Sequence, residues 1–117
     1  MQDIIERYLA AWNETDPHAR RTLIDELWAE DASYTDPLGQ AHGRAEIDAL
    51  IAAAQAQFPG LRFSLAGPVD AHHQQARFSW GLGQPGAEPM VVGFDVAVTD
   101  GQGRLATVLG FLDKVPT

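Results

Sequence analysis

QFPGLRFSL, residues 57–65, is the stretch in which the hydrophobic period of the sequence changes. Before it, apolar residues recur at helical spacing, and the pair Pro59 and Gly60 is typical of a helix end. After it, Leu61, Phe63 and Leu65 alternate with polar residues, which is typical of a strand that buries one face. Helices followed by strands predict an α+β domain, with helices packed on one face of an antiparallel sheet.

The first predicted helix lies within DIIERYLAAWNE, residues 3–14. Its apolar residues recur three and four apart, so Tyr8 and Trp12 lie on one face. Asp3 and Glu6 have the spacing of a capping box, in which each side chain binds a free backbone N–H group. We therefore expect the helix to begin near Asp3.

Two further helices are predicted before residue 59. One begins at Asp16, with proline at its first position, and is expected to carry Trp28 inward. A short strand follows around Tyr34, and the third helix covers roughly residues 44–58. Period-two alternation then predicts four strands, over residues 61–66, 77–82, 90–99 and 105–114.

Length and composition limit the classes of function. A chain of 117 residues is long enough to bury one core, so we expect a single domain over residues 1–117. It has no cysteine, which excludes thiolate metal sites and thiol catalysis. Its formal charge of -8 disfavours nucleic acid as a partner. No apolar run is long enough for an export signal or a membrane span, so we expect a cytoplasmic protein without a membrane partner.

Two acids stand in places where chemistry is possible. Asp36 ends the predicted strand in SYTDPLG, residues 33–39, where it could cap a turn or act as a proton carrier at the mouth of a pocket. Asp95 is the one acid in VVGFDVAV, residues 91–98. If it faces inward, desolvation should raise the pKa of its carboxyl group; the alternative is that it faces solvent or a partner chain.

The chain resembles the nuclear transport factor two-like superfamily, and within it the SnoaL-like and steroid ketoisomerase-like proteins. Four stretches carry the resemblance, in order: ERYLAAWNETD (residues 6–16), SYTDPLG (33–39), HGRAEI (42–47) and VVGFDVAV (91–98). The resemblance implies a cone-shaped barrel, in which three N-terminal helices pack on a strongly curved, mostly antiparallel sheet. It also implies an apolar pocket, open at one end.

The resemblance implies three catalytic residues: Tyr8, Asp36 and Asp95. In the ketoisomerases a tyrosine and a protonated acid donate hydrogen bonds to a substrate carbonyl, and a second acid moves the proton. Donors that are already in place stabilise the negative charge that develops on the carbonyl oxygen. The alternative for Tyr8 is a structural role, as a tyrosine in the hydrophobic core whose hydroxyl group is hydrogen-bonded within the protein. No cofactor and no metal are expected.

Aromatic residues more often belong to the core than contact a ligand, but a large apolar pocket must be lined by such residues, so they are candidates for its wall. The candidates are Trp12, Trp28, Tyr34, Phe58, Phe63 and Trp80. His42 could reach the pocket mouth, and Arg77 could be recruited as in the epoxide hydrolase-like members. His72 and His73 lie in a predicted turn, where a metal site is not expected.

Two functions follow, and the sequence leaves both open. The first is a cofactor-independent acid–base enzyme, an isomerase, cyclase or dehydratase, acting on an apolar carbonyl compound. The second is a non-catalytic module of the same fold, which binds a hydrophobic ligand or serves as a dimerising scaffold. Convergence of Tyr8, Asp36 and Asp95 on one cavity would favour the enzyme.

The predicted strand around Asp95 also suggests an assembly. If Asp95 faces the cavity, alternation puts an apolar stripe on the outer face: Val92, Phe94, Val96 and Val98. Contiguous apolar patches are uncommon on the surfaces of monomers. We therefore expect a homodimer packed sheet to sheet, with Phe94 near its centre.

Overall fold

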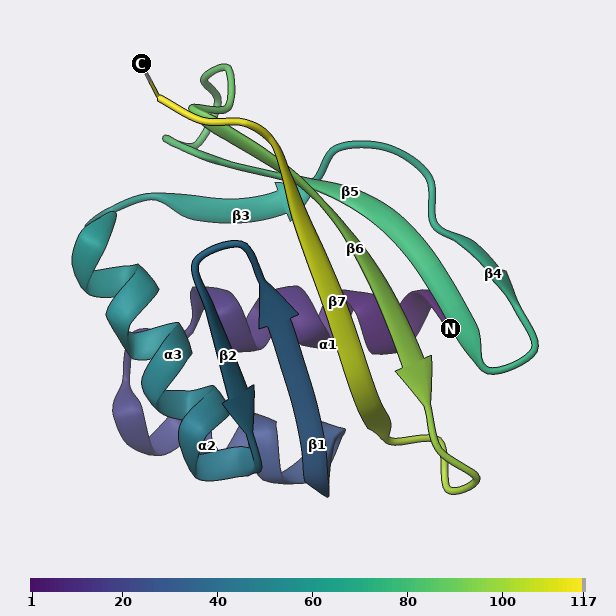
Figure 1. The fold of residues 1–117 in the computed structure, drawn as a ribbon. Helices are drawn as coiled ribbons and strands as arrows, with labels where there is room; N and C mark the ends of the chain where they lie inside the picture. The colour runs from purple at the N-terminus through teal and green to yellow at the C-terminus, as the bar shows by residue number, and fades with distance from the viewer. Residues whose placement is uncertain (117) are drawn as a thin grey trace.

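The computed structural model describes residues 1–116, and it contains three helices and seven strands (Figure 1). In chain order the elements are α1 (Gln2–Asn13), α2 (Pro17–Leu27), β1 (Trp28–Asp36), β2 (Gly39–His42), α3 (Arg44–Gln57), β3 (Arg62–Leu65), β4 (Asp70–His72), β5 (Gln75–Gly83), β6 (Val91–Thr99) and β7 (Leu105–Lys114). No helix in the described part of the chain is long and apolar enough to cross a membrane.

All seven strands belong to one sheet, which curves around α1 (Figure 1). The strand order is β2-β1-β7-β6-β5-β3, with β4 paired to β5. Every pair is antiparallel except β1 with β7, which run parallel. The predicted α+β class and mostly antiparallel sheet are confirmed. The sheet is open between β2 and β3, so the cone is not a closed barrel.

The helix ends differ from the predicted ones in two places. The N-cap of α1 is Met1, without a side-chain cap, so the predicted capping box at Asp3 is wrong. The N-cap of α2 is Asp16, as predicted, and its carboxylate accepts a hydrogen bond from the Ala19 amide at 2.8 Å. This helix ends at Leu27 because Trp28 is already extended, with φ −95° and ψ 146°. Trp28 therefore opens β1, and the prediction that α2 carries it is wrong.

A buried arginine fixes the helices relative to each other. Arg20, on α2, is 5% exposed, and its Nε donates to Asp48 Oδ1 on α3 at 2.7 Å. Its guanidinium also donates to Gln55 Oε1 at 3.0 Å. The Gln55 amide in turn donates to the backbone oxygens of Trp12 and Glu14, at the end of α1. These bonds hold the end of α1 in place, and with it the ring of Trp12.

A second arginine ties the start of α3 to the sheet. Gly43 precedes this helix with a φ of 83°, a conformation that residues other than glycine rarely adopt. Arg44 then donates from Nε and from its guanidinium to the Trp28 backbone oxygen, at 2.9 and 2.7 Å. Arg44 thus anchors the junction of α2 and β1.

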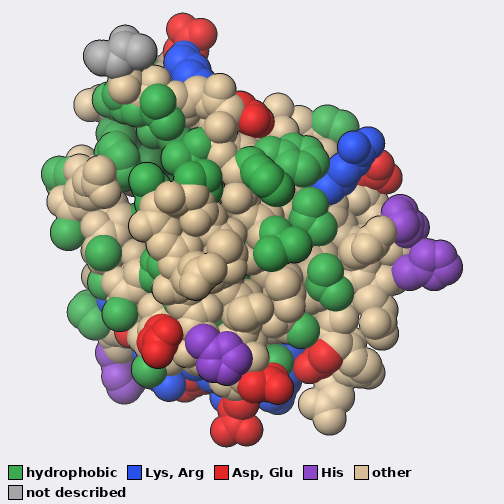
Figure 2. Space-filling model, in the orientation of Figure 1, with side chains coloured by type: hydrophobic (Ala, Val, Ile, Leu, Met, Phe, Trp, Pro, Cys, Tyr) green, Lys and Arg blue, Asp and Glu red, His purple; other side chains and the backbone are tan. Residues whose placement is uncertain are grey.

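The strand β6 alternates regularly between the two faces of the sheet. Gly93, Asp95 and Ala97 are buried on the concave face, as the sequence predicts for an inward Asp95. The outer face carries a hydrophobic stripe, and Figure 2 shows apolar side chains gathered there, over the middle of the sheet. The stripe consists of Val92, Phe94, Val96 and Val98 on β6, with Leu109 (42% exposed) and Phe111 (56% exposed) beside them on β7.

We propose that a second copy of the chain covers this outer stripe. Phe94→Glu would put a charge opposite Phe111, the residue with which Phe94 is paired on β7. Burying an unpaired charge at a contact is strongly destabilising, so we expect the variant to be monomeric. Static light scattering of wild type, Phe94→Glu and the control Gln102→Glu, in the exposed β6–β7 turn, checks this. A monomeric wild type at high concentration would contradict the proposal.

Candidate active site

A cavity of about 360 Å³ lies at one end of the cone. Its wall comes from α1, β1 and the start of β2, α3 from Leu50 onward, the strands β3, β5, β6 and β7, and residues 115–116 after β7. The exposed Leu38 stands at its rim, with Val115 and Pro116. A cavity of this size and apolar character is typical of a small-molecule site.

Tyr8 and Asp95 form a buried hydrogen-bonded pair in the wall of this cavity. The Tyr8 hydroxyl donates to Asp95 Oδ2 at 2.8 Å, and both residues are 2% exposed. Asp95 Oδ1 is also buried but has no hydrogen-bond partner among residues 1–116. A carboxylate oxygen left without a partner is costly, so this atom is available for a ligand.

Burial changes the protonation of the pair. Desolvation raises the pKa of Asp95 to about 6, an effect to which the negative charge of Asp36 adds. The Trp80 indole and the Tyr8 hydroxyl partly oppose the rise, because they stabilise the charged form. Burial and the nearby Asp95 raise the pKa of Tyr8 well above its usual value, so Tyr8 remains a neutral donor.

A second tyrosine and acid lie across the strands from the first pair. The Tyr34 hydroxyl donates to Asp36 Oδ2 at 2.6 Å. Asp36 Oδ1 accepts from the amides of Leu38 and Gly39, at 2.8 and 3.0 Å, so Asp36 does cap its turn. Burial, with the two acids nearby, raises the pKa of Tyr34. Because Asp36 also lines the cavity, turn capping and chemistry are both open to it.

Gly110 on β7 is the point at which the two pairs meet. It is paired with Asp95 on one side and lies beside the end of β1 on the other. A Cβ atom at this position would be 2.9 Å from Asp95 Oδ1, 3.3 Å from Asp36 Cβ and 3.6 Å from the Tyr34 hydroxyl. The absence of a side chain at Gly110 therefore allows Asp95 and Asp36 to approach the strand closely from either side.

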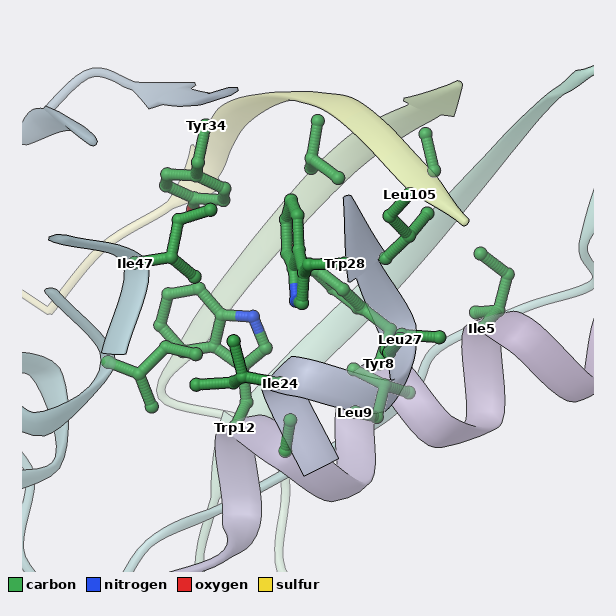
Figure 3. Close-up of a cluster of buried hydrophobic side chains, with 14 of the residues drawn as sticks. Ile5, Tyr8, Leu9, Trp12, Ile24, Leu27, Trp28, Tyr34, Ile47 and Leu105 are labelled. Atoms are coloured by element: carbon green, nitrogen blue, oxygen red, sulfur yellow. The ribbon is translucent and has the colours of Figure 1, made fainter. Parts of the chain in front are cut away.

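Five of the six aromatic candidates line the cavity: Trp12, Tyr34, Phe58, Phe63 and Trp80. The sixth, Trp28, is completely buried and is not in the wall. Its ring lies in the core beside Tyr8, at a centroid distance of 5.9 Å (Figure 3). Trp28 opens β1 and its ring belongs to the hydrophobic core, so it does not line this cavity.

The other polar candidates lie elsewhere. His42 is exposed at the end of β2 and is not in the cavity wall. Arg77 is exposed on β5, where its Nε donates to Asp70 at 3.1 Å. His72 and His73 lie in and next to β4, where they are exposed. Within residues 1–116 no group of three or more acids and histidines is placed to hold a metal ion.

Two features of the site were not predicted. Tyr34 was predicted as a wall residue, whereas its hydroxyl group also donates to Asp36. The strand-interior glycines were not considered, although glycine inside a strand often marks a close approach of other groups. Gly93 is the second case, since a Cβ there would be 2.1 Å from the Trp80 ring. In the sequence, the sign of these close approaches was a glycine inside each of two predicted strands, Gly93 and Gly110.

Asp95 should make the free energy of unfolding fall with rising pH. Because its pKa is raised from 3.8 to about 6, the folded protein keeps a proton that the unfolded chain has lost. The contribution of Asp95 to stability should therefore decline by about 2 to 3 kcal/mol across this range. We expect Asp95→Asn to gain stability relative to wild type between pH 4 and about 7, in urea titrations. Parallel stability curves for the two proteins would contradict the assignment.

Gly110→Ala should disturb the site without changing the fold. The new methyl group would press on Asp95 Oδ1, so we expect a loss of about 1 to 3 kcal/mol of stability and a change in the pKa of Asp95. Carboxyl carbon NMR and urea titration measure the two effects. Gly101→Ala is the control, since nothing lies within 4 Å of a Cβ at that position. Identical behaviour of the two variants would show that the space over Gly110 is not tight.

Comparison with known proteins identifies the family to which the chain is similar. A family model described as SnoaL-like domain matches residues 5–107. The crystal structure of a candidate isomerase of the SnoaL-like family from Agrobacterium tumefaciens is similar to this chain, with 46% sequence identity and a TM-score of 0.91. The similarity covers 96% of each chain. No protein with a curated description matches.

More distant structures share the fold. One is a protein with a ketosteroid isomerase-like fold from Catenulispora acidiphila, in complex with trimethylamine. It is 22% identical to this chain, with a TM-score of 0.72, and the similarity covers 92% of this chain and 82% of that one. Another is a candidate polyketide cyclase from Sinorhizobium meliloti, at 20% identity and a TM-score of 0.72, covering 92% and 93%. The family match spans most of the sequence, and the chain therefore belongs to the SnoaL-like family.

Proposed function

We propose that this protein is a cofactor-independent acid–base enzyme that acts on a small, apolar carbonyl compound. The observation that carries the proposal is the convergence of Asp36 and the Tyr8–Asp95 pair on one cavity. Acids in different environments are suited to different steps of one proton transfer. Here Asp95 is buried and has a raised pKa, whereas Asp36 accepts three hydrogen bonds at the start of the β1–β2 turn.

Asp95 is the group suited to stabilise the substrate oxygen. In its protonated form, Asp95 would donate a hydrogen bond from Oδ1 to the carbonyl oxygen of a substrate in the cavity. Tyr8 holds the other oxygen of the same carboxyl group, at 2.8 Å, and so orients it. Trp12 is also a wall residue, and its indole N–H is buried without an acceptor among residues 1–116. It offers a second donor.

Asp36 is the group suited to move the proton. The C–H bond next to the carbonyl breaks, Asp36 accepts the proton, and the electron pair moves toward the oxygen that Asp95 binds. Return of the proton to another carbon completes an isomerisation. Attack of the same carbon on a second carbonyl, whose oxygen takes the proton from Asp36, completes a cyclisation. Departure of a β-hydroxyl group as water, with the proton from Asp36, completes a dehydration. The wall residues fit all three outcomes, because they are apolar apart from these few groups.

One observation favours the non-catalytic alternative. Both oxygens of Asp36 already accept hydrogen bonds within the chain. Hydrogen bonds of this kind, from the two amides that follow the acid, are what a purely structural turn requires. In this alternative the cavity binds an apolar ligand without turnover, and Asp36 holds only the β1–β2 turn.

Hydrogen–deuterium exchange separates the two functions. Enones and β-diketones are incubated in D₂O with wild type or with Asp36→Asn, and deuterium at the α-carbon is followed by NMR. Asn keeps the side-chain oxygen for the turn but cannot accept the proton, so we expect a loss of at least about a hundredfold in the exchange rate. Asp31→Asn, exposed on the same strand, removes the same charge and should exchange at the wild-type rate. Equal rates in all three proteins would refute a catalytic Asp36.

A further inference from the structure

The cavity wall has negative charge and no positive charge to balance it. Asp36 and Asp95 both line it, but no lysine, arginine or histidine does so among the described residues. The chain as a whole has a formal charge of -8, which adds to the negative potential. The arginines Arg20 and Arg44 are occupied by other partners, in the helix contacts and at the α2–β1 junction. An anionic ligand would therefore meet repulsion, and a cationic one attraction.

The apolar part of the wall is mainly aromatic. Four rings follow one another in contact, from Tyr34 to Trp12, Phe63 and Trp80, with centroid distances of 5.6, 5.3 and 5.4 Å. All four line the cavity. Aromatic faces carry partial negative charge and attract alkylammonium groups, most strongly where water is excluded. The same rings also pack against neutral alkyl groups, so they favour a cation without requiring one.

The Oδ1 atom of Asp95, which has no hydrogen-bond partner among residues 1–116, fixes the position of one negative charge in the cavity wall. The residue is 2% exposed, lines the cavity, and has no partner for Oδ1 among residues 1–116. The groups around it are Tyr8 on α1, Tyr34 and Asp36 on β1, Trp80 on β5 and Gly110 on β7. None of these can be a cation. The Trp80 indole lies near the carboxyl group and lowers its pKa, but Oδ1 accepts no hydrogen bond within the described part of the chain, so a ligand N–H can supply one.

We propose that the cavity binds a small apolar amine in its protonated form, with the ammonium N–H donating to Asp95 Oδ1 and the alkyl groups packed on the aromatic wall. This binding function goes beyond the proposed proton transfer and does not depend on turnover. A secondary or tertiary amine fits better than a quaternary one, because a quaternary nitrogen has no hydrogen to donate.

The two ligand classes would bind different protonation states of Asp95. A carbonyl compound needs the protonated form, which donates, whereas an amine needs the ionised form, which accepts. Since the pKa of Asp95 is about 6, amine binding should strengthen as the pH rises through this value. Carbonyl binding should weaken over the same range. Asp36 is the other acid facing the cavity, so the pH profile must be compared between variants.

The volume of the cavity determines how large a test ligand should be. A volume of about 360 Å³ equals that of about a dozen water molecules at roughly 30 Å³ each, so a ligand of about a dozen non-hydrogen atoms should fit. A suitable amine is 4-[2-(dimethylamino)ethyl]phenol. Its neutral isostere, 4-(3-methylbutyl)phenol, has a carbon in place of the nitrogen and the same shape. The trimethylammonium analogue keeps the charge and lacks the N–H.

The test is isothermal titration calorimetry of the three probes at pH 5 and pH 8. At pH 8 we expect the dimethylamine to bind wild type at least about tenfold more tightly than its isostere, with the trimethylammonium analogue in between. At pH 5 the advantage should shrink severalfold. Asp95→Asn should lose the preference for the amine, and Asp31→Asn, which removes an exposed charge from β1, should keep it.

Equal or tighter binding of the isostere at pH 8 would overturn the proposal. So would an amine preference that is unchanged in Asp95→Asn, since the attraction would then come from the overall charge. These outcomes leave the proposed acid–base function untouched, because that function depends on deuterium exchange and on Asp36. Conversely, absence of exchange in every protein, with a clear amine preference, would identify a binding protein for amines.

Discussion

The burial of a single carboxylate, Asp95, is the constraint on which the site depends. A charged group that is 2% exposed is costly, and the structure offers it one hydrogen bond from Tyr8 and no cation. The inward position of Asp95 leaves the outer face of β6 to valines and phenylalanine. It also requires glycine at position 110, because a side chain there would occupy the space of the carboxylate. The polarity of the cavity, the glycine on β7 and the apolar outer face of β6 are thus all linked to the inward position of Asp95.

Much of the fold could be predicted from the sequence because its signals are local. Period changes and turn residues predicted the three helices and the four strands that correspond to β3, β5, β6 and β7. The end of α2 was misplaced at Trp28, because a tryptophan fits a buried helix face and a buried strand equally well. The parallel pairing of β1 with β7 has no local signal, since the two strands are far apart in sequence.

The candidate site was predicted less completely. Tyr8, Asp36 and Asp95 were named because a resemblance supplied their roles, and the structure places all three around one cavity. Their hydrogen-bond partners could not be predicted from spacing. The bond between Tyr34 and Asp36 depends on two side chains of one strand reaching along the same face. The contribution of Gly110 depends on the register of three strands, which no single stretch of sequence specifies.

The central place of β7 in the sheet has a consequence for how the site forms. Residues 105–114 are the last strand along the chain, yet they lie between β1 and β6 and join the two halves of the sheet. Until this strand is inserted, Asp36 and Asp95 belong to separate hairpins with no shared neighbour. Contacts between segments this far apart form late, because they close long loops of chain. The cavity should therefore be among the last parts of the molecule to form, and a ligand that binds it should favour the docked state of the final strand.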